Sequence, residues 1–332
     1  MKRPKILVVG SFVMDQIATT EVFPNEGQTV LGKSFAKAPG GKGANQAVQA
    51  ARLGADVTMV GKIGRDANGA ELKKTCDEAG INTDYVAYDD NEASGCAVIV
   101  LESKPGEQTK NRIIVLSGSN MTIKEEDVAF LRDSISEYDM VILQLEIPME
   151  INELVASYAG SAGVPVMLNP APSAPLSDDL LKNLTYISPN EHEIADLTGI
   201  KIEHEGKNIN MDQVKAACDA LRKRGVDNVL VTLGESGAAL VNEEGFSYAP
   251  CAQGVMAVDP TAAGDSFLGA FCTGVCCGWS YDEILRFANH TSAITVSNLG
   301  AMPSLPSLED VEAYMKQKGM EVPDTSSLKK RR

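Results

Sequence analysis

The segment from Ala257 to Phe267, Ala-Val-Asp-Pro-Thr-Ala-Ala-Gly-Asp-Ser-Phe, carries the residue types best suited to chemistry. A short apolar strand ends there at Asp259, and the small residues that follow predict the start of a helix with Asp265 just inside it. The bare backbone N–H groups of such a start carry a positive partial charge, which suits a phosphate or a developing oxyanion. A carboxylate held beside them could act as a general base for a hydroxyl. An acid that only caps a turn is the alternative.

A second candidate site is the segment Pro39–Ala47, Pro-Gly-Gly-Lys-Gly-Ala-Asn-Gln-Ala. Its glycines permit a close approach of the backbone to a ligand. Asn45 falls in the first turn of the helix expected next, where its amide can donate to and accept from a polyol. A flexible turn would explain the glycines, but it would not explain Lys42 and Asn45 beside them.

Familiar nucleotide motifs are missing from the sequence. It contains no G-x-x-x-x-G-K-[ST] segment, and no G-x-G-x-x-G follows the first expected strand, which excludes a P-loop and argues against a dinucleotide fold. Asn190 with Glu193 three residues later predicts a helix capping box, whose side chains could also face a metal-bound phosphate. The glycine-rich turn after the strand at 231–232 is a weak sign of a nucleotide contact.

Two further acids follow strands. Asp15 comes soon after the first expected strand, and Glu146 ends a central one. Because open α/β sheets bind ligands at the carboxyl ends of their strands, both are candidates for a ligand site.

The elements that would position these residues alternate between strand and helix patterns, which predicts an α/β fold with a mainly parallel sheet and helices on both faces. The expected core strands are Ile6–Val9, Val57–Val60, Met140–Leu145, Val166–Leu168, Tyr186–Ser188 and Val229–Thr232. Helices are expected at about residues 43–53, 67–79, 124–132, 149–161, 211–223, 264–277 and 281–295.

Two stretches, about 13–38 and 93–116, carry strand patterns without intervening helices. We expect them to pair as a small antiparallel sheet outside the main one, with strands at Thr29–Phe35, Cys96–Leu101 and Arg112–Leu116. A flap over the site is the favoured interpretation, and a decorative surface sheet is the alternative.

Composition narrows the class of protein. A net charge of −15 argues against nucleic acid or an anionic membrane as the main partner. The seven cysteines show no framework spacing, which favours free thiols in a reducing cytosol. His192, His204 and His290 lack metal-ligand spacing, so structural zinc is not expected.

No apolar run reaches the ~20 residues of a membrane helix, and the first residues lack the pattern of a signal peptide. We therefore expect a cytoplasmic protein with a single domain at 1–320 and a disordered basic tail at 321–332.

Together and in this order, these segments resemble the ribokinase family of sugar kinases, the PfkB-type carbohydrate kinases. The resemblance covers residues 5–318 and rests on two signatures, at 40–45 and 259–265. Within that family Gly-Gly-Lys-Gly-Ala-Asn-Gln is more similar to ribokinases than to fructokinases or adenosine kinases. Three further segments also look like ribokinase: Gln144–Glu146, Asn169–Pro172 and Gly300–Pro306.

The resemblance implies a ribokinase-like three-layer sandwich with a small β-sheet lid, through which two subunits pair as a homodimer. It implies ATP-dependent phosphorylation of D-ribose at O5, with Mg²⁺ accompanying ATP and K⁺ as an activating cation. Asp265 matches the family's catalytic base, and the amides of Ala263 and Gly264 match its anion hole. Such a reaction asks mostly for positioning and charge stabilisation at the transferred group.

The other matching positions fall into three sets. Those around the sugar are Val13, Asp15, Gly41, Lys42, Asn45 and Glu146. Those around ATP are Asn190, Thr232, Gly234, Gly237, Gly264 and Asn289, with Glu193 organising Mg²⁺ and the phosphates. Those of the monovalent-cation site are Asp259, Thr261, Thr295, Asn298, Gly300 and Ser304.

Three positions depart from the family pattern. Val13 stands where ribokinases often have an Asn that contacts the sugar, Pro260 replaces a Thr, and Asn298 replaces a longer basic residue. Two alternatives to a ribose kinase remain. One is a kinase of another sugar, such as deoxyribose or fructose, or of a nucleoside. The other is a non-catalytic sugar sensor, and four intact residues argue against it: Asp265, Gly264, Lys42 and Asn45.

Overall fold

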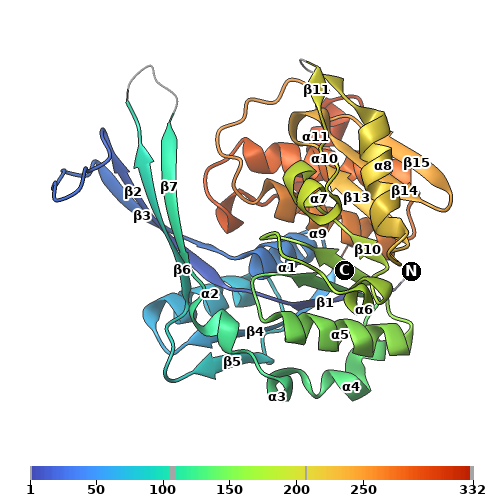
Figure 1. The fold of residues 1–332 in the computed structure, drawn as a ribbon, viewed down its shortest axis with the longest axis horizontal. Coiled ribbons are helices and arrows are strands. Elements are labelled where there is room, and N and C mark those ends of the chain that lie inside the picture. The colour runs from blue at the N-terminus through green and yellow to red at the C-terminus, as the bar shows by residue number, and fades with distance from the viewer. Residues whose placement is uncertain (1, 105–108, 206–207, 330–332) are drawn as a thin grey trace.

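The computed structural model describes residues 2–104, 109–205 and 208–329. Its main sheet has nine strands in the order β15-β14-β13-β10-β9-β8-β1-β4-β5 (Figure 1). β14 runs antiparallel to both of its neighbours, β13 and β15, and the other adjacent strands of this sheet pair in parallel. In chain order the strands are β1 (Lys5–Val9), β4 (Asp56–Gly64), β5 (Val86–Asp89), β8 (Met140–Gln144), β9 (Val166–Asn169), β10 (Tyr186–Ile187), β13 (Asn228–Thr232), β14 (Ala238–Asn242) and β15 (Gly245–Ala249).

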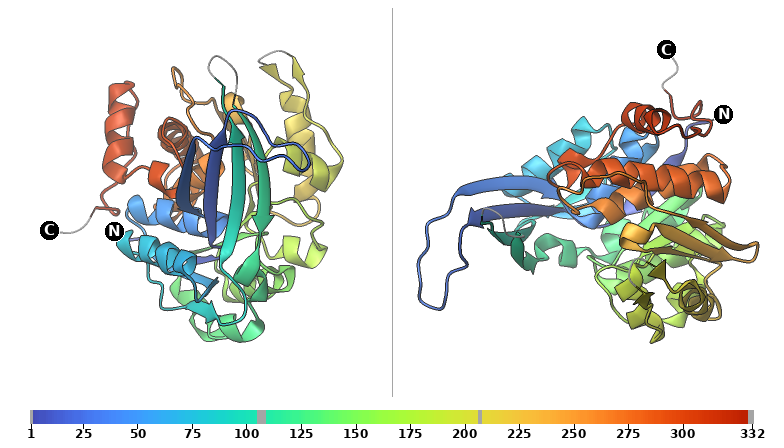
Figure 2. Two further views of the ribbon diagram at one scale, coloured as in Figure 1. Left: turned by 90° about the vertical axis from the view of Figure 1, so that its left-hand side faces the viewer. Right: turned by 90° about the horizontal axis from the view of Figure 1, so that it is seen from above.

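Helices cover both faces of this sheet, which confirms the expected three-layer α/β fold (Figures 1 and 2). In β1, Ile6 and Val8 point into one core and Leu7 and Val9 into the other, because successive side chains of a strand face opposite sides. The first core is closed by α1 (Lys42–Arg52), α2 (Ala67–Glu78), α9 (Ala263–Cys276), α10 (Tyr281–Val296) and α11 (Leu308–Gln317). The second is closed by α3 (Glu125–Val128), α4 (Leu131–Ser134), α5 (Met149–Ala162), α6 (Asp178–Lys182), α7 (Glu191–Thr198) and α8 (Met211–Arg222).

The expected core strands are all present, whereas β5, β14 and β15 were not predicted. One expected helix is interrupted: residues 124–132 form α3 and the start of α4, separated by a turn at Ala129 and Phe130. The ring of Phe130 at this break stacks on Tyr85, with ring centroids 4.1 Å apart. Packing onto the segment before β5 therefore accompanies the break.

A second sheet, which we call the small sheet, extends from one side of the main body (Figures 1 and 2). Its strands are β3 (Ser34–Gly40), β2 (Val13–Thr20), β6 (Gly95–Glu102) and β7 (Lys110–Leu116), in that order. The expectation of a wholly antiparallel sheet is wrong, because its two central strands, β2 and β6, run parallel. The strand expected at Thr29–Phe35 is also misplaced: pairing with β2 begins only at Ser34. A separate pair, β11 (His204–Glu205) and β12 (Asn208–Ile209), is antiparallel.

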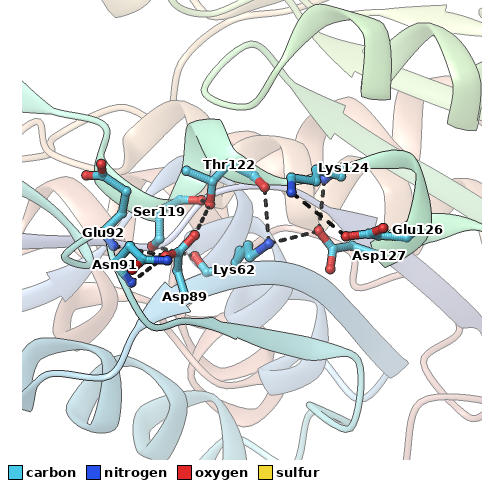
Figure 3. A network of polar contacts seen from close by, with 9 residues as sticks. All are labelled: Lys62, Asp89, Asn91, Glu92, Ser119, Thr122, Lys124, Glu126 and Asp127. Carbon is cyan, nitrogen blue, oxygen red and sulfur yellow. Dashed lines mark hydrogen bonds and ion pairs between the residues drawn. The ribbon is translucent and has the colours of Figure 1, made fainter.

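A polar network fixes the root of the small sheet, where the chain enters β6 and leaves β7 (Figure 3). The carboxylate of Asp89 accepts from Thr122 Oγ1 at 2.6 Å and from the amides of Asn91 and Glu92. These hydrogen bonds, that of Thr122 foremost, lower the pKa of Asp89 to about 2. Lys62 of β4 donates to Thr122 O and pairs with Asp127, both at 3.1 Å. Both connections of the β6–β7 hairpin are thereby tied to the main sheet.

The expectation of a disordered tail at 321–332 is not met in the part that the structure describes, which ends at residue 329. Leu328 is buried in the first core, and its carbonyl lies so close to Gly54 that a Cβ there would come within 2.3 Å of it. Thr325 Oγ1 donates to Glu312 of α11 at 2.5 Å. The last three residues lie outside the described part. Among the described residues, no helix has the length and apolarity to cross a bilayer.

Candidate active site

The start of α9 is the centre of the candidate site. Ala262, just before the helix, has a φ of 60°, a left-handed conformation that costs a non-glycine residue about 1–2 kcal/mol. A Cβ placed on Gly264 would meet nothing within 4 Å, so this turn is open on its outer side. No described residue accepts a hydrogen bond from the amide of Gly264, whereas Ala263 N donates to Pro260 O at 3.2 Å. Of the two amides expected to bind an anion, only that of Gly264 is unoccupied.

Asp265 lies in the first turn of α9 and is only 8 % exposed. Two side-chain amides from α1 hold its carboxylate: Asn45 Nδ2 donates to Oδ2 at 2.9 Å, and Gln46 Nε2 donates to Oδ1 at 2.8 Å. Hydrogen bonds to a charged group are among the stronger ones in proteins. The two signature segments, more than two hundred residues apart in sequence, therefore meet at one carboxylate.

Asn45 also presents a buried acceptor that a ligand could satisfy. It is 4 % exposed, and its Oδ1 has no hydrogen-bond partner among the described residues. A buried acceptor without a partner costs about 1–3 kcal/mol. A ligand hydroxyl beside Asp265 would satisfy this atom, and this agrees with the expectation of a polyol contact at Asn45.

A cavity of about 240 Å³ opens at the start of α9. Residues lining it that were expected around the sugar or ATP are Lys42, Asn190, Glu193, Thr232, Ala263, Gly264 and Asp265. The remaining lining residues, for which no role was expected, are Asn169, Ala171, Ser188, Pro260, Ala262 and Leu268. Elements from both halves of the chain thus surround a single space.

Lys42, the first residue of α1, supplies the positive charge of this cavity. Burial by itself would lower the pKa of its ammonium group, but the negative charges of Asp265, Glu146 and Glu193 outweigh that effect and raise it. Lys42 therefore stays charged at neutral pH. Its position among three carboxylates makes it the local counter-charge of an acidic site.

The carboxylates expected around a sugar gather beside the glycine segment. Glu146 accepts from Ser11 Oγ at 2.5 Å and from the backbone amide of Lys42 at 3.0 Å. Burial, with the charges of Glu146 and Asp259, raises the pKa of Asp15 from 3.8 to about 6. A Cβ on Gly41 would stand 2.6 Å from Val13 N, which explains why only glycine, here at a φ of 96°, fits between β2 and α1.

Val13 and Asp15 lie on the same face of β2, because alternate residues of a strand share a face. Val13 is buried and pairs with Gly40 across the small sheet. The structure thus places an apolar side chain next to the acid of the candidate sugar site.

Some of the positions expected around ATP line the cavity, and others hold the loops near it. Asn190 caps α7 by accepting from the amides of His192 and Glu193, and Asn190 N donates to Glu193 Oε2 at 2.8 Å. This is the expected capping box. Burial raises the pKa of Glu193, against the opposing effects of Asn190 N and Lys42. Thr232 N donates to Pro189 O at 3.1 Å, which joins β13 to this capped turn.

Gly234, Gly237 and Asn289 do not line the cavity. Asn289 of α10 is buried and donates to the carbonyls of Ala249 and Pro250, each at 3.1 Å. A Cβ on Gly237 would come within 2.1 Å of Ala249 O. Both residues shape the loop that follows β15.

Three positions expected at the monovalent-cation site are in contact. Asp259 accepts from the amide and hydroxyl of Thr261, at 2.9 and 2.6 Å, and from the amide of Gly300 at 2.9 Å. Burial alone would raise the pKa of Asp259, but these hydrogen bonds lower it. They join the loop before α9 to the loop after α10.

The side chains of the other three positions are engaged elsewhere. Thr295 donates to Ser266 at 2.7 Å, Ser304 to Ala301 O at 2.7 Å, and Asn298 to Ile294 O at 2.8 Å. These hydrogen bonds use the donor groups of the three side chains and leave oxygen lone pairs available to a cation.

The acidic side chains also bear on Mg²⁺. Within the described ranges, no three His, Cys, Asp or Glu side chains form a cluster that could hold a metal. Mg²⁺ normally binds one or two carboxylates together with substrate phosphates and water. Glu193, a carboxylate that lines the cavity, fits an ion that arrives with a nucleotide rather than one caged by protein.

Some functional candidates escaped sequence reasoning. Gln46 belongs to the glycine segment, and Gln144 and Asn169 belong to two of the other segments that look like ribokinase. No role was expected for any of the three side chains. Gln46 Nε2 also donates to Asn169 Oδ1 at 3.2 Å, and Gln144 Nε2 donates to Gln46 Oε1 at 2.7 Å. A polar residue at the end of a buried strand, as at Gln144, was the available signal.

Comparison with known proteins matches residues 3–308 to the pfkB family of carbohydrate kinases. A ribokinase from Schizosaccharomyces pombe is 39 % identical over 314 residues, covering 92 % of this chain and 96 % of that protein. A deoxyribokinase from Salmonella typhi is 31 % identical over 311 residues, covering 93 % and 98 %. The structure of Arabidopsis thaliana ribokinase complexed with ribose and ATP superimposes with a TM-score of 0.85 at 35 % identity, covering 95 % of this chain and 99 % of that one.

The raised pKa of Asp15 predicts that Asp15→Asn increases the free energy of unfolding at pH 7. The folded chain holds the proton of Asp15 up to about pH 6, whereas the unfolded chain releases it near 3.8. Stability is therefore lost as the pH rises between these values. The difference corresponds to at most about 3 kcal/mol, and the partial exposure of Asp15 reduces it.

Urea unfolding of both proteins between pH 4 and 7 measures this effect. The advantage of Asp15→Asn should grow from pH 4 to pH 6 and then level off, whereas Asp84→Asn, at an exposed position, should show no such trend. An advantage that does not change with pH would contradict the burial of this charge.

Proposed function

Because this chain belongs to the pfkB family of carbohydrate kinases, we propose that it transfers the γ-phosphoryl group of ATP to the 5-hydroxyl of D-ribose. The observation that carries this proposal is the carboxylate of Asp265, held at an open helix start beside the free amide of Gly264. The similarity to ribokinases, one of which was solved with ribose and ATP, supports ribose as the sugar.

In the proposed reaction Asp265 accepts the proton of the 5-hydroxyl as its oxygen attacks the γ-phosphorus. The bond between O5 and the phosphorus forms, the bond to the β,γ-bridging oxygen breaks, and ADP leaves. The amide of Gly264 donates to the transferred group, helped by Ala263 if its weak bond to Pro260 opens. Glu193 would hold the Mg²⁺ that comes with ATP, and that ion supplies neutralisation of the phosphate charge.

Replacing Asp265 by Asn tests the base. The amide keeps the shape but cannot take a proton, so kcat should fall by at least ~100-fold while ATP and sugar still bind. A coupled assay of ADP release gives kcat, and calorimetry gives binding. The matched control is Asp282→Asn, an exposed acid in the first turn of α10, which should keep normal turnover. Near-normal turnover of Asp265→Asn would remove this residue from the mechanism.

Val13 favours a second candidate substrate, 2-deoxyribose. An apolar side chain beside Asp15 offers a sugar hydroxyl no hydrogen bond, so the site would gain little from that hydroxyl. The deoxyribokinase among the relatives supports this candidate. A non-catalytic sugar sensor remains a further alternative, and it would bind a sugar without releasing ADP.

A panel of pentoses, hexoses and nucleosides, assayed for ADP release, separates these candidates. We expect the ratio of kcat/KM for ribose over 2-deoxyribose to stay within about tenfold of unity in the native chain. Val13→Asn should raise that ratio at least ~10-fold, since one hydrogen bond to a hydroxyl is restored. Val22→Asn, at an exposed position, is the control. Equal ratios in the two variants would place Val13 away from the sugar.

We also propose that K⁺ activates the reaction from behind the helix start. Asp259, Thr261 and Gly300 are already joined there, and carboxylate, hydroxyl and carbonyl oxygens suit a hard cation. The ion would fix the loop that carries the amides at 263 and 264. Pro260 stiffens the same loop and could reduce the dependence.

Accordingly, kcat should be clearly higher in potassium than in tetramethylammonium at matched ionic strength, with a smaller change in KM. Preorganised donors of this kind are worth ~3–4 kcal/mol each when removed. Initial rates in the two buffers measure the effect, and Na⁺ is expected to lie between them. Equal kcat values would mean that no such site is used.

The small sheet carries two further proposals. As a lid it would exclude water, which otherwise competes for the phosphoryl group. As a pairing surface it would join two copies of the chain, because β7 is exposed along its whole length. Exposed apolar residues lie on the sheet, at Phe35, Ile113, Ile114, Val115 and Leu116, and in the loop before β3, at Leu31. The mass of the protein in solution tests the dimer. A cytoplasmic location stays a prediction.

A further inference from the structure

A line of buried side-chain amides connects β8 to Asp265. Gln144, the last residue of β8, donates from Nε2 to Gln46 Oε1 at 2.7 Å. Gln46, on α1, donates from Nε2 to Asp265 Oδ1 at 2.8 Å and to Asn169 Oδ1 at 3.2 Å. Both glutamines are completely buried. The orientation of each amide therefore depends on protein groups alone.

A glutamine amide can turn either its NH₂ group or its oxygen toward a neighbour, and only the NH₂ group attracts a carboxylate. Two contacts decide this choice for Gln46. Its oxygen is taken by Gln144 Nε2, and the second N–H of its NH₂ group is taken by Asn169 Oδ1. Turned the other way, Gln46 would lose these bonds and place its oxygen against Asp265.

Close packing in turn fixes the position of the Gln144 side chain, and its hydrogen bond to Gln46 fixes which end of its amide faces α1. A Cβ on Gly10 would stand 2.0 Å from Gln144 Oε1, so the bare backbone of β1's end leaves room for this side chain and for no larger neighbour. Gln144 Oε1 itself has no partner among the described residues. A buried acceptor without a partner costs free energy. The hydrogen bond that Nε2 of the same amide donates to Gln46 offsets part of that cost.

We propose that Gln46 is a positioning residue for Asp265, and that Gln144 sets which end of the Gln46 amide faces that carboxylate. The inference rests on the proposed function, since it assigns a purpose to the orientation of the proposed base. Asn45 holds the other carboxylate oxygen, so the two amides together fix the plane of the group. A base held in one plane takes up the substrate proton without first reorienting.

The sharpest test is Gln46→Glu, which keeps the size of the side chain but sets a second carboxylate against Asp265 Oδ1. Two adjacent carboxylates resist ionising together, so the acidic limb of the kcat/KM profile should move to higher pH by about one unit or more. If residue 46 did not face the base, the substitution would lower stability without moving this limb.

Gln49 provides a matched control one turn further along α1. It is also completely buried. Its side chain donates to Pro306 O and accepts from Ser266 Oγ, both at 3.0 Å, and has no hydrogen bond to Asp265. Gln49→Glu should therefore lower the melting temperature as Gln46→Glu does, with the acidic limb unmoved. An equal shift in both variants, or no shift in Gln46→Glu, would overturn the proposal.

A second pair of variants decides the matter if a buried glutamate prevents folding. Gln144→Leu and Gln46→Met remove the amides but keep the volume, and each should lower kcat about 10- to 100-fold with KM for both substrates nearly unchanged. Because both act through one contact, the double variant should lose little more than either single one. If the losses in kcat were fully additive, or if kcat were unchanged in both single variants, the proposed action of Gln144 through Gln46 would be contradicted.

The outcomes also separate this inference from the proposed function. If Asp265→Asn keeps its turnover, the base itself is wrongly assigned. If Asp265→Asn is inactive while kcat of Gln46→Met and Gln144→Leu and the pH profile of Gln46→Glu are unchanged, Asp265 is the base and only the positioning role of Gln46 and Gln144 fails.

Discussion

The site depends on the contact between the first turns of α1 and α9, where two amides hold one carboxylate. That contact requires the two helices to approach closely. A Cβ on Gly269 of α9 would stand 2.9 Å from the side chain of Gln49 and 3.0 Å from Gln46 O, so a larger residue would force the helices apart. Asn45, Gln46 and Asp265 would then lose their hydrogen bonds. Close helix packing therefore comes first, and the orientation of the proposed base follows from it.

The charges around this contact work against folding. Glu146, Glu193 and Asp265 gather near one ammonium group, that of Lys42, and Asp15 lies within reach of the charge of Glu146. Burial raises the pKa of both Asp15 and Glu193. A chain selected only for stability would not collect acids in this way. The excess is tolerable because hydrogen bonds satisfy Asp265 and Glu146, and because hydroxyls and a cation-bound nucleotide would satisfy the rest. The negative net charge of −15 is thus compatible with an anionic ligand, whose partners are local.

Sequence reasoning located the carboxylate and the glycine segment because both patterns are local. Small residues before Asp265 predict an open helix start, and the glycines before Asn45 predict a close backbone approach. It failed where segments distant in the sequence pair with each other. The parallel pairing of β2 with β6 depends on the register between strands about eighty residues apart, which no local sequence pattern predicts. The roles of Gln46 and Gln144 were missed for a similar reason, since a glutamine within a helix or at the end of a strand gives no signal until its neighbour is known. The tail at 321–329 was misjudged because its polar composition conceals one core residue, Leu328.

The most direct test of the central claim is a crystal structure of this chain with ribose and a non-transferable ATP analogue. The account predicts that one oxygen of Asp265 lies within about 2.6–3.2 Å of the sugar's primary hydroxyl. It also predicts that the amide of Gly264 donates to the terminal phosphate, while Asn45 and Gln46 still hold the carboxylate. A primary hydroxyl paired with Glu146 or Glu193, with Asp265 facing no ligand atom, would contradict it.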